Sequence, residues 1–200
     1  LGRYDSIASC LAAAVRENVT LDGIDLRGVN LACANLDGAR MRGASFENAN
    51  LTGANLSECN LRGANFSGAV LYNACLCESD LSGCSFKYAG FGATDIRDSL
   101  LSGARFAGLS TFSLDFGSAG NMRNAAYETP DGMRHALTRP PVTIAGLSYP
   151  VSLLDEAVLI GHDAWPYETD PGSIPVQKRA LFLALRHNPF QGFFHARSSR

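Results

Sequence analysis

The sequence predicts an all-β solenoid, a square coil of about five turns with four sides per turn and five residues per side. Two nested periods indicate this fold. An apolar residue recurs at every fifth position from Leu21 to Phe116, with Thr111 as the exception. Within that series a phenylalanine recurs every twenty residues, at Phe46, Phe66, Phe86 and Phe106. A period of five fits neither an α-helix nor a flat strand, whereas a chain that bends every five residues accommodates it.

Each five-residue unit repeats the same arrangement of residue types. Residues 64–68, Ala-Asn-Phe-Ser-Gly, are a typical unit. The small residue comes first, the polar residue second and the central apolar residue third. We expect the central and small residues to point inward and the other three outward, with Asn, Asp and Gly at the corners. The phenylalanine column should stack along the axis, in coils about 4.8 Å apart. One corner is predicted to have positive φ in every coil, at Gly23, Gly43, Gly63, Gly83 and Gly103.

This pattern resembles the pentapeptide-repeat family, whose consensus is Ala-(Asp/Asn)-Leu-x-x. The resemblance extends from Val19 to about Phe116. It implies a right-handed quadrilateral β-helix. It does not imply one function, because members of the family range from topoisomerase-inhibiting DNA mimics to proteins with no known activity.

Three regions are predicted along the chain: a cap helix over 1–18, the β-helix over 19–118 and a non-repeat module over 119–200. Apolar residues at helical spacing indicate a helix from Asp5 to Asn18, which Asp5 or Ser6 can cap. We expect this helix to cover the open edge of the first coil, since solenoid ends need caps; a partner-binding helix is the alternative.

The C-terminal region is predicted to be a small α+β module. All eight prolines lie at or beyond Pro130, which indicates a boundary near 117–125. We expect mostly loop over 121–140, strands over 142–145, 149–154 and 157–160, and a helix over 177–187. Trp165 is expected to anchor the core of this module.

A second resemblance concerns residues 146–162. They resemble the C-terminal module of pentapeptide-repeat proteins encoded by bacteriophages and prophages, which also begin with a short helix leading into the repeats. Those proteins have a cysteine after Ile-Gly, where this chain has His162. The resemblance implies a phage-like origin and no particular chemistry.

Charge and cysteine content restrict the function. The net charge is −2, without the basic excess of a nucleic-acid-binding protein, so direct nucleic-acid binding is not expected. The six cysteines have no metal-site spacing; Cys59 and Cys84 occupy inward positions, and Cys75 and Cys77 should point outward. Unpaired thiols predict a cytoplasmic protein. No signal peptide or membrane span is evident, and the first residue, Leu1, leaves open whether a segment precedes it.

The clearest outward feature is a column of acidic residues. Glu58, Glu78 and Asp98 occupy one corner of successive coils, and Asp95 and Asp115 lie nearby on the same side. Like charges on adjacent strands cost stability, so one interpretation of the column is a role in binding a basic partner or in imitating a phosphate backbone. The alternative is a solvated, screened surface, and Arg42 and Arg62 predict a surface of mixed sign.

No catalytic, cofactor-binding or metal-binding residues are predicted. All four histidines lie outside the repeats, at His135, His162, His187 and His195. The chain has no phosphate-binding glycine loop, histidine pair at metal spacing or serine elbow. The sequence therefore favours a non-enzymatic structural or protein-interaction protein, without a cofactor or membrane association.

Three functions remain open. The favoured one is a rigid rod, phage- or prophage-related, that binds an unidentified protein partner. The alternatives are a DNA-mimicking regulator of a type II topoisomerase such as gyrase, or of another DNA-binding protein, and an enzyme housed in the C-terminal module. An exposed Phe112 and the terminal Phe190, Phe193 and Phe194 suggest a buried contact, within the chain or in a homo-oligomer.

Overall fold

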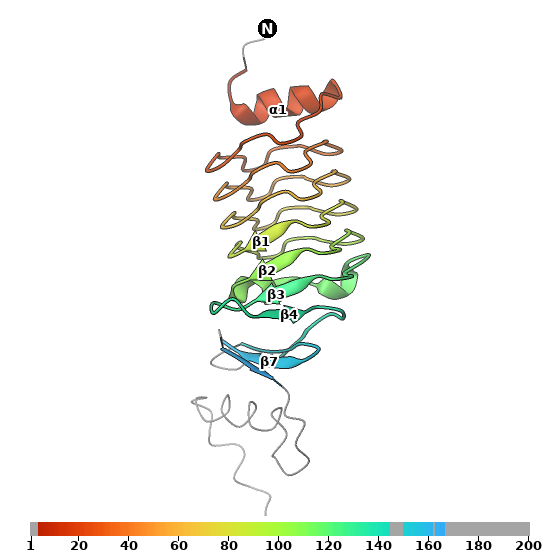
Figure 1. The fold of residues 1–200 in the computed structure, drawn as a ribbon. Helices are drawn as coiled ribbons and strands as arrows, with labels where there is room; N and C mark the ends of the chain where they lie inside the picture. Colours follow the sequence, from red (N-terminus) through yellow and green to blue (C-terminus); the bar gives the residue numbers. More distant parts are fainter. Residues whose placement is uncertain (1–3, 145–149, 162, 167–200) are drawn as a thin grey trace, which may run out of the picture.

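The computed structural model describes residues 4–144, 150–161 and 163–166, and its repeats form a rod of stacked coils (Figure 1). Parallel bridges join residues twenty apart, from Asp25 with Ser45 to Asp80 with Leu100. Val70 shows how one coil is hydrogen-bonded to the preceding coil. Its carbonyl accepts from the Leu51 N–H at 2.8 Å, and its own N–H donates to the Ala49 carbonyl at 2.9 Å. The predicted all-β solenoid, a right-handed quadrilateral β-helix, is confirmed.

The interior contains the central and small residues of each unit, as predicted. Phe66 and Ala64 are both completely buried. The ring centroids of Phe46, Phe66, Phe86 and Phe106 lie 4.8, 5.0 and 5.3 Å apart in succession, with interplanar angles of 10° or less. The rings therefore stack at the spacing that the backbone ladder imposes, which confirms the predicted core column.

Every corner after a central residue, from Gly23 to Gly108, has a left-handed backbone. The predicted glycine column has φ between +64° and +71°. The same conformation occurs at positions without glycine, including Glu58 at +53°, Glu78 at +57° and Asp98 at +57°. Glycine adopts this region freely, whereas a residue with a Cβ atom is strained there. The acidic column is therefore built at positions where glycine would be more stable.

The N-terminal helix α1 (Ile7–Arg16) lies across the open end of the first coil (Figure 1). Ser6 caps it: its hydroxyl accepts from the Ser9 N–H at 3.1 Å, and the Ser9 hydroxyl accepts from the Ser6 N–H at 3.1 Å. Leu11 is buried in the same apolar core as the coils. These contacts confirm the predicted cap helix.

The parallel ladder continues past residue 118, where the repeat region was expected to end. Strands β1 (Ser85–Lys87), β2 (Arg105–Ala107) and β3 (Ala126–Glu128) pair in parallel, and β4 (Arg134–Ala136) pairs antiparallel with β3. The expectation of loop over 121–140 is wrong for β3 and β4. The reversed strand β4 ends the parallel ladder.

A one-residue insertion explains the missed strand. Phe86 pairs with Phe106, twenty residues on, but Phe106 pairs with Tyr127, twenty-one residues on. Two 3₁₀ turns, η1 (Leu109–Ser113) and η2 (Phe116–Ser118), lie in this longer coil. The apolar series therefore resumes one position late, with Met122 and Tyr127 buried.

The C-terminal end of the rod is covered by a second, antiparallel sheet. It consists of β5 (Val142–Ile144), β6 (Val151–Leu153), β7 (Ala157–Ile160) and β8 (Asp163–Pro166), in that order. The first three confirm the predicted strands. The strand β8 was not predicted, because Pro166 argues against a strand except at an edge, and β8 is an edge strand.

This sheet is joined to the rod by a shared core and by one carboxylate. Leu154 and Leu159 are buried in the core that also contains Leu137. The Asp155 carboxylate accepts from the Thr138 N–H at 2.7 Å and from Arg139 Nε at 2.8 Å. The junction is therefore both apolar and hydrogen-bonded.

Several expectations concern residues outside the described part. The helix predicted over 177–187, His162, His187, His195 and the three terminal phenylalanines lie there, as does the Trp165 side chain. Phe112 makes the contact that was expected within the chain: its ring packs on Tyr127 of β3, with centroids 5.0 Å apart, and is partly buried rather than exposed. No helix in the described residues has the length and hydrophobicity needed to span a membrane.

Candidate functional site

Charged residues are sorted between the four sides of the rod. We define the acidic side as residues 34–38, 54–58, 74–78, 94–98 and 114–118, which stack in successive coils. One basic residue, Arg97, lies on it, together with six acidic residues, Asp37, Glu58, Glu78, Asp95, Asp98 and Asp115. On the side centred on Leu31, Leu51, Leu71, Phe91 and Thr111 there is no charged residue.

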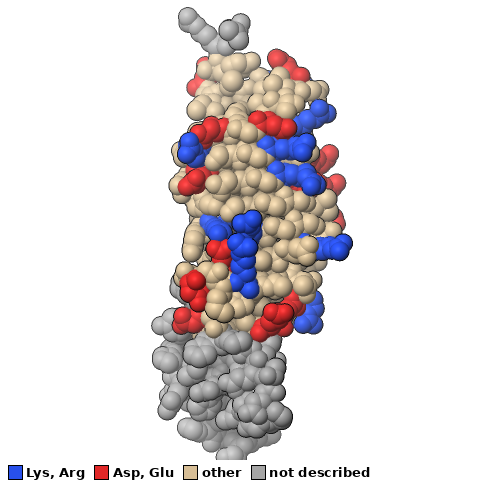
Figure 2. Space-filling model, viewed as in Figure 1, with Lys and Arg blue, Asp and Glu red and all other residues tan. Residues whose placement is uncertain are grey.

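The other two sides hold a slight basic excess. Their acidic residues are Asp22, Asp25, Glu47 and Asp80, and their basic residues are Arg27, Arg40, Arg42, Arg62, Lys87 and Arg105. Figure 2 shows one face of the rod, with both signs scattered over a largely uncharged surface. The surface is therefore a patchwork of both signs, in which the acidic side has an excess of negative charge. The small net charge of the chain conceals this separation.

The residues of the acidic column stack one above another along one corner of the rod. The backbone N–H groups of Glu58, Glu78 and Asp98 each donate to the next coil, at 2.9, 2.8 and 2.9 Å. All three side chains are exposed, and among the described residues none of their carboxylates has an ion-pair partner. The column therefore presents uncompensated charges.

The other two predicted acidic residues have local partners. Arg97 binds Asp95 through two nitrogens, with the closest contact at 2.6 Å, and these hydrogen bonds lower the pKa of Asp95 to about 2. Asp115 accepts from the Gly117 N–H at 3.1 Å and so caps the turn η2. Both have structural roles that the acidic column lacks.

We expect Glu78→Gly to raise the free energy of unfolding by about 1 kcal/mol, because glycine relieves the left-handed backbone strain at this corner. Urea unfolding followed by circular dichroism measures the change. Glu78→Gln is the matched control: it removes the charge, keeps the strained backbone and should gain less than about 0.5 kcal/mol. Equal gains for the two variants would contradict the role given to the backbone.

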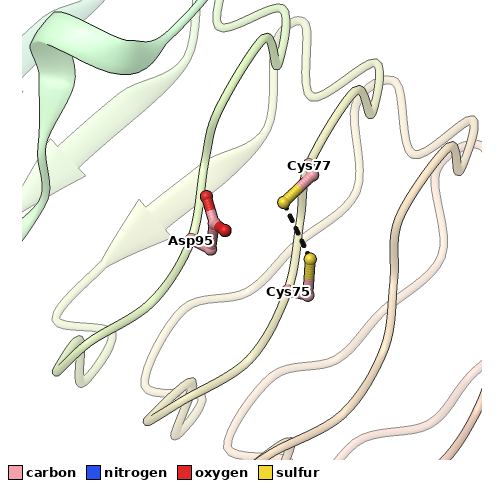
Figure 3. A group of neighbouring side chains, drawn as sticks. All are labelled: Cys75, Cys77 and Asp95. Carbon is pink, nitrogen blue, oxygen red and sulfur yellow. Dashed lines mark hydrogen bonds between the residues drawn. The ribbon is translucent and has the colours of Figure 1, made fainter.

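A second group of side chains lies on the acidic side. Cys75 and Cys77 are two positions apart on one coil, and their sulfur atoms are 2.8 Å apart (Figure 3). Asp95 lies beside Cys75 on the next coil, joined to it by a parallel bridge. One ligand atom from each of these three side chains lies within 4.8 Å of the others. The Ser57 hydroxyl approaches from the preceding coil, 3.0 Å from the Cys75 sulfur.

The two thiols of this group differ in acidity. Burial opposes ionisation of Cys75, but hydrogen bonds from the Cys77 thiol, the Ser57 hydroxyl and the Cys77 N–H outweigh it and lower the pKa of Cys75. Burial, followed by the hydrogen bonds to Cys75 and Asp95, raises the pKa of Cys77 to about 12. The two sulfur atoms are joined by one hydrogen bond, in which either can be the donor.

Cys59 and Cys84 are structural, as predicted. Both are buried and donate to the carbonyls of Leu36 at 3.1 Å and Leu61 at 3.0 Å. Burial raises the pKa of each to about 12. The group of Cys75, Cys77 and Asp95 was missed in the sequence, because Asp95 is twenty residues from Cys75. The group could have been found by comparing positions twenty residues apart, which stack in neighbouring coils.

Two hollows on the rod are shallow and open. One is lined by Asp25, Arg27, Gly28, Glu47 and Asn48, and the other by Asp22, Arg42, Gly43, Arg62, Gly63 and Ser82. Neither lining contains a histidine or a cysteine. These hollows therefore do not bring a nucleophile and a neutral base together.

The repeats match a known family along most of the rod. The model for pentapeptide repeats matches in eight copies, within residues 17–48, 44–83 and 64–103. Residues 17–103 are pentapeptide repeats. No curated protein matches the sequence.

Solved pentapeptide-repeat structures resemble this chain in part. A pentapeptide-repeat protein from the Arabidopsis thaliana thylakoid lumen is 34% identical, over 40% of this chain and 63% of its own, with a TM-score of 0.31. Rfr23 from the cyanobacterium Cyanothece 51142 is 17% identical over 55% of this chain and 84% of its own, with a TM-score of 0.44. QnrB1, a plasmid-mediated fluoroquinolone resistance protein, is 12% identical over 56% of this chain and 63% of its own, with a TM-score of 0.32. This chain thus spans less than two thirds of the thylakoid lumen protein.

Proposed function

We propose that this chain is a non-enzymatic interaction protein whose acidic side binds a basic surface of a protein partner. The separation of charge carries the proposal: six acidic residues share one side with a single arginine. Three of them, Glu58, Glu78 and Asp98, sit at left-handed corners without ion-pair partners among the described residues. Folding gains nothing from that arrangement, since like charges and strained corners both cost stability.

The rod suits this role physically. Each coil is hydrogen-bonded to its neighbours, so the column is held rigid before a partner arrives. A rigid site loses little conformational entropy on binding. Complementary charge steers the encounter and rejects acidic proteins. We further propose a phage or prophage origin, from the resemblance of residues 146–162, and a cytoplasmic location, from the free cysteines.

A second candidate is a DNA-mimicking regulator of a type II topoisomerase. It is favoured by the same acidic column, whose carboxylates follow one another along the rod as phosphates do along a nucleic-acid strand. A DNA gyrase supercoiling assay tests it. Inhibition at micromolar protein, lost in Glu58→Gln/Glu78→Gln/Asp98→Asn, is expected of a mimic, and unchanged supercoiling rejects it.

The main proposal is tested by removing the charges of the acidic column. We expect Glu58→Gln/Glu78→Gln/Asp98→Asn to reduce partner capture from host extract by about tenfold or more, because the lost charges face the partner. Quantitative mass spectrometry of the captured proteins measures the loss, and titration with the purified partner confirms it.

The matched control removes the same number of charges elsewhere. Asp25→Asn/Glu47→Gln/Asp80→Asn changes residues on the two sides with a basic excess. Capture by this control should stay within about twofold of the unaltered chain, because those sides do not face the partner. Equal losses in both variants would indicate a non-specific effect of net charge, and no loss in the first would remove the acidic side from the function.

A further inference from the structure

Cys75, Cys77 and Asp95 bring three metal-ligating side chains together from two coils. Cys75 and Cys77 flank the buried Leu76, so both project from the outer surface of one coil (Figure 3). The Asp95 carboxylate reaches the same point from the next coil. All three side chains are partly buried, so an ion there would be partly shielded from water and still accessible to it.

The backbone opposes a disulfide between the two cysteines. Residues two apart on an extended strand are separated by about 6.6 Å, close to the upper limit for the Cα atoms of a disulfide. Shortening that distance means bending the coil. The Cys75 N–H donates to the Ala54 carbonyl at 2.9 Å, and the Cys77 carbonyl accepts from the Glu58 N–H at 2.9 Å. These two bonds hold each cysteine to the preceding coil and so resist the bend.

A metal ion makes no such demand on the backbone. In a tetrahedral zinc site the Zn–S bonds are about 2.3 Å, so two thiolates lie about 3.8 Å apart. The sulfur atoms here are closer than that, at 2.8 Å. Outward rotation of the two side chains is enough to reach the required separation. Thiolate ligands also select zinc or other thiophilic ions over magnesium and calcium.

We propose that Cys75, Cys77 and Asp95 bind one zinc ion, or a thiophilic ion of the same class, with a fourth position open to water. Both thiols release their protons to solvent on binding. Two thiolates and one carboxylate leave a charge of −1 around a divalent ion, which the Arg97 guanidinium beside Asp95 balances. A carboxylate has more lone-pair sites than the Arg97 hydrogen bonds occupy, so Asp95 can bind both.

Cobalt(II) titration of the reduced full-length chain tests the proposal. A thiolate-to-cobalt charge-transfer band should saturate at one ion per chain and disappear when zinc is added. Cys75→Ser/Cys77→Ser should lose the band. Cys10→Ser/Cys33→Ser, which removes the two exposed cysteines outside the site, should keep it. Thermal melting of both variants checks that they are folded.

Two further measurements make the outcome decisive. Asp95→Asn should weaken zinc binding by about tenfold or more, because it removes one charged ligand of the ion. Zinc should protect Cys75 and Cys77, and not Cys10 and Cys33, from alkylation, as read by mass spectrometry. No cobalt band in the unaltered chain, a band that survives Cys75→Ser/Cys77→Ser, or a Cys75–Cys77 disulfide that forms equally fast with zinc present would each overturn the proposal.

Discussion

Phe66→Ala is expected to lower the free energy of unfolding by about 3–5 kcal/mol, the usual cost of emptying a fully buried phenylalanine site. The Phe66 ring lies between those of Phe46 and Phe86, with centroid distances of 4.8 and 5.0 Å. The coils cannot close the cavity, because hydrogen bonds on both sides fix their spacing. Urea unfolding followed by circular dichroism measures the loss.

Tyr88→Ala is the matched control for Phe66→Ala. It removes a ring of similar size from the outside of the rod, where 60% of Tyr88 is exposed. We expect a loss of no more than about 1 kcal/mol, as for most surface substitutions. Similar losses for the two variants would show that the stacked rings contribute no more than surface contacts.

Ser85→Pro is expected to cost about 3 kcal/mol or more and to disrupt the ladder locally. The Ser85 N–H donates to the Ala64 carbonyl at 3.0 Å, and Ser85 pairs with Arg105 on the other side. Proline removes that donor from the middle of the rod, and each coil depends on its neighbours for hydrogen bonds. Faster hydrogen exchange in residues 61–80 and 101–107 is the measurement that locates the damage.

Ser85→Ala separates the backbone effect from the loss of the side chain. It keeps the N–H and removes only the hydroxyl, which lies 2.9 Å from that of Ser67. We expect a cost of about 1 kcal/mol, as for one hydrogen bond. If Ser85→Pro were no less stable than Ser85→Ala, the ladder would not be the main support of the rod.

The repeats were predictable because one local pattern fixes the same geometry many times. A phenylalanine every twenty residues is enough to place Phe46 over Phe66. The left-handed corners at Glu58 and Glu78 were not predicted, because glutamate is no signal for positive φ. The coil imposes that conformation through its hydrogen bonds, whatever residue occupies the corner.

Features that depend on relations between coils were harder to predict. The acidic column was found because its members share a corner, but the uneven distribution of charge emerges only when every charged residue is assigned to a side. The pairing of Tyr127 with Phe106 was missed, because one inserted residue breaks the step of five. The group around Cys75 was missed because its third member belongs to another coil.

The extra residue between Phe106 and Tyr127 has an evolutionary consequence. A tandem duplication of twenty residues would lengthen this rod and leave every column aligned. A change of any other length would rotate all later residues relative to the earlier ones. The single insertion occurs in the last full coil, so little of the parallel ladder lies beyond it. This architecture therefore permits the gene to lengthen by segments that encode whole turns. Insertions of other lengths are tolerated only near the end of the rod.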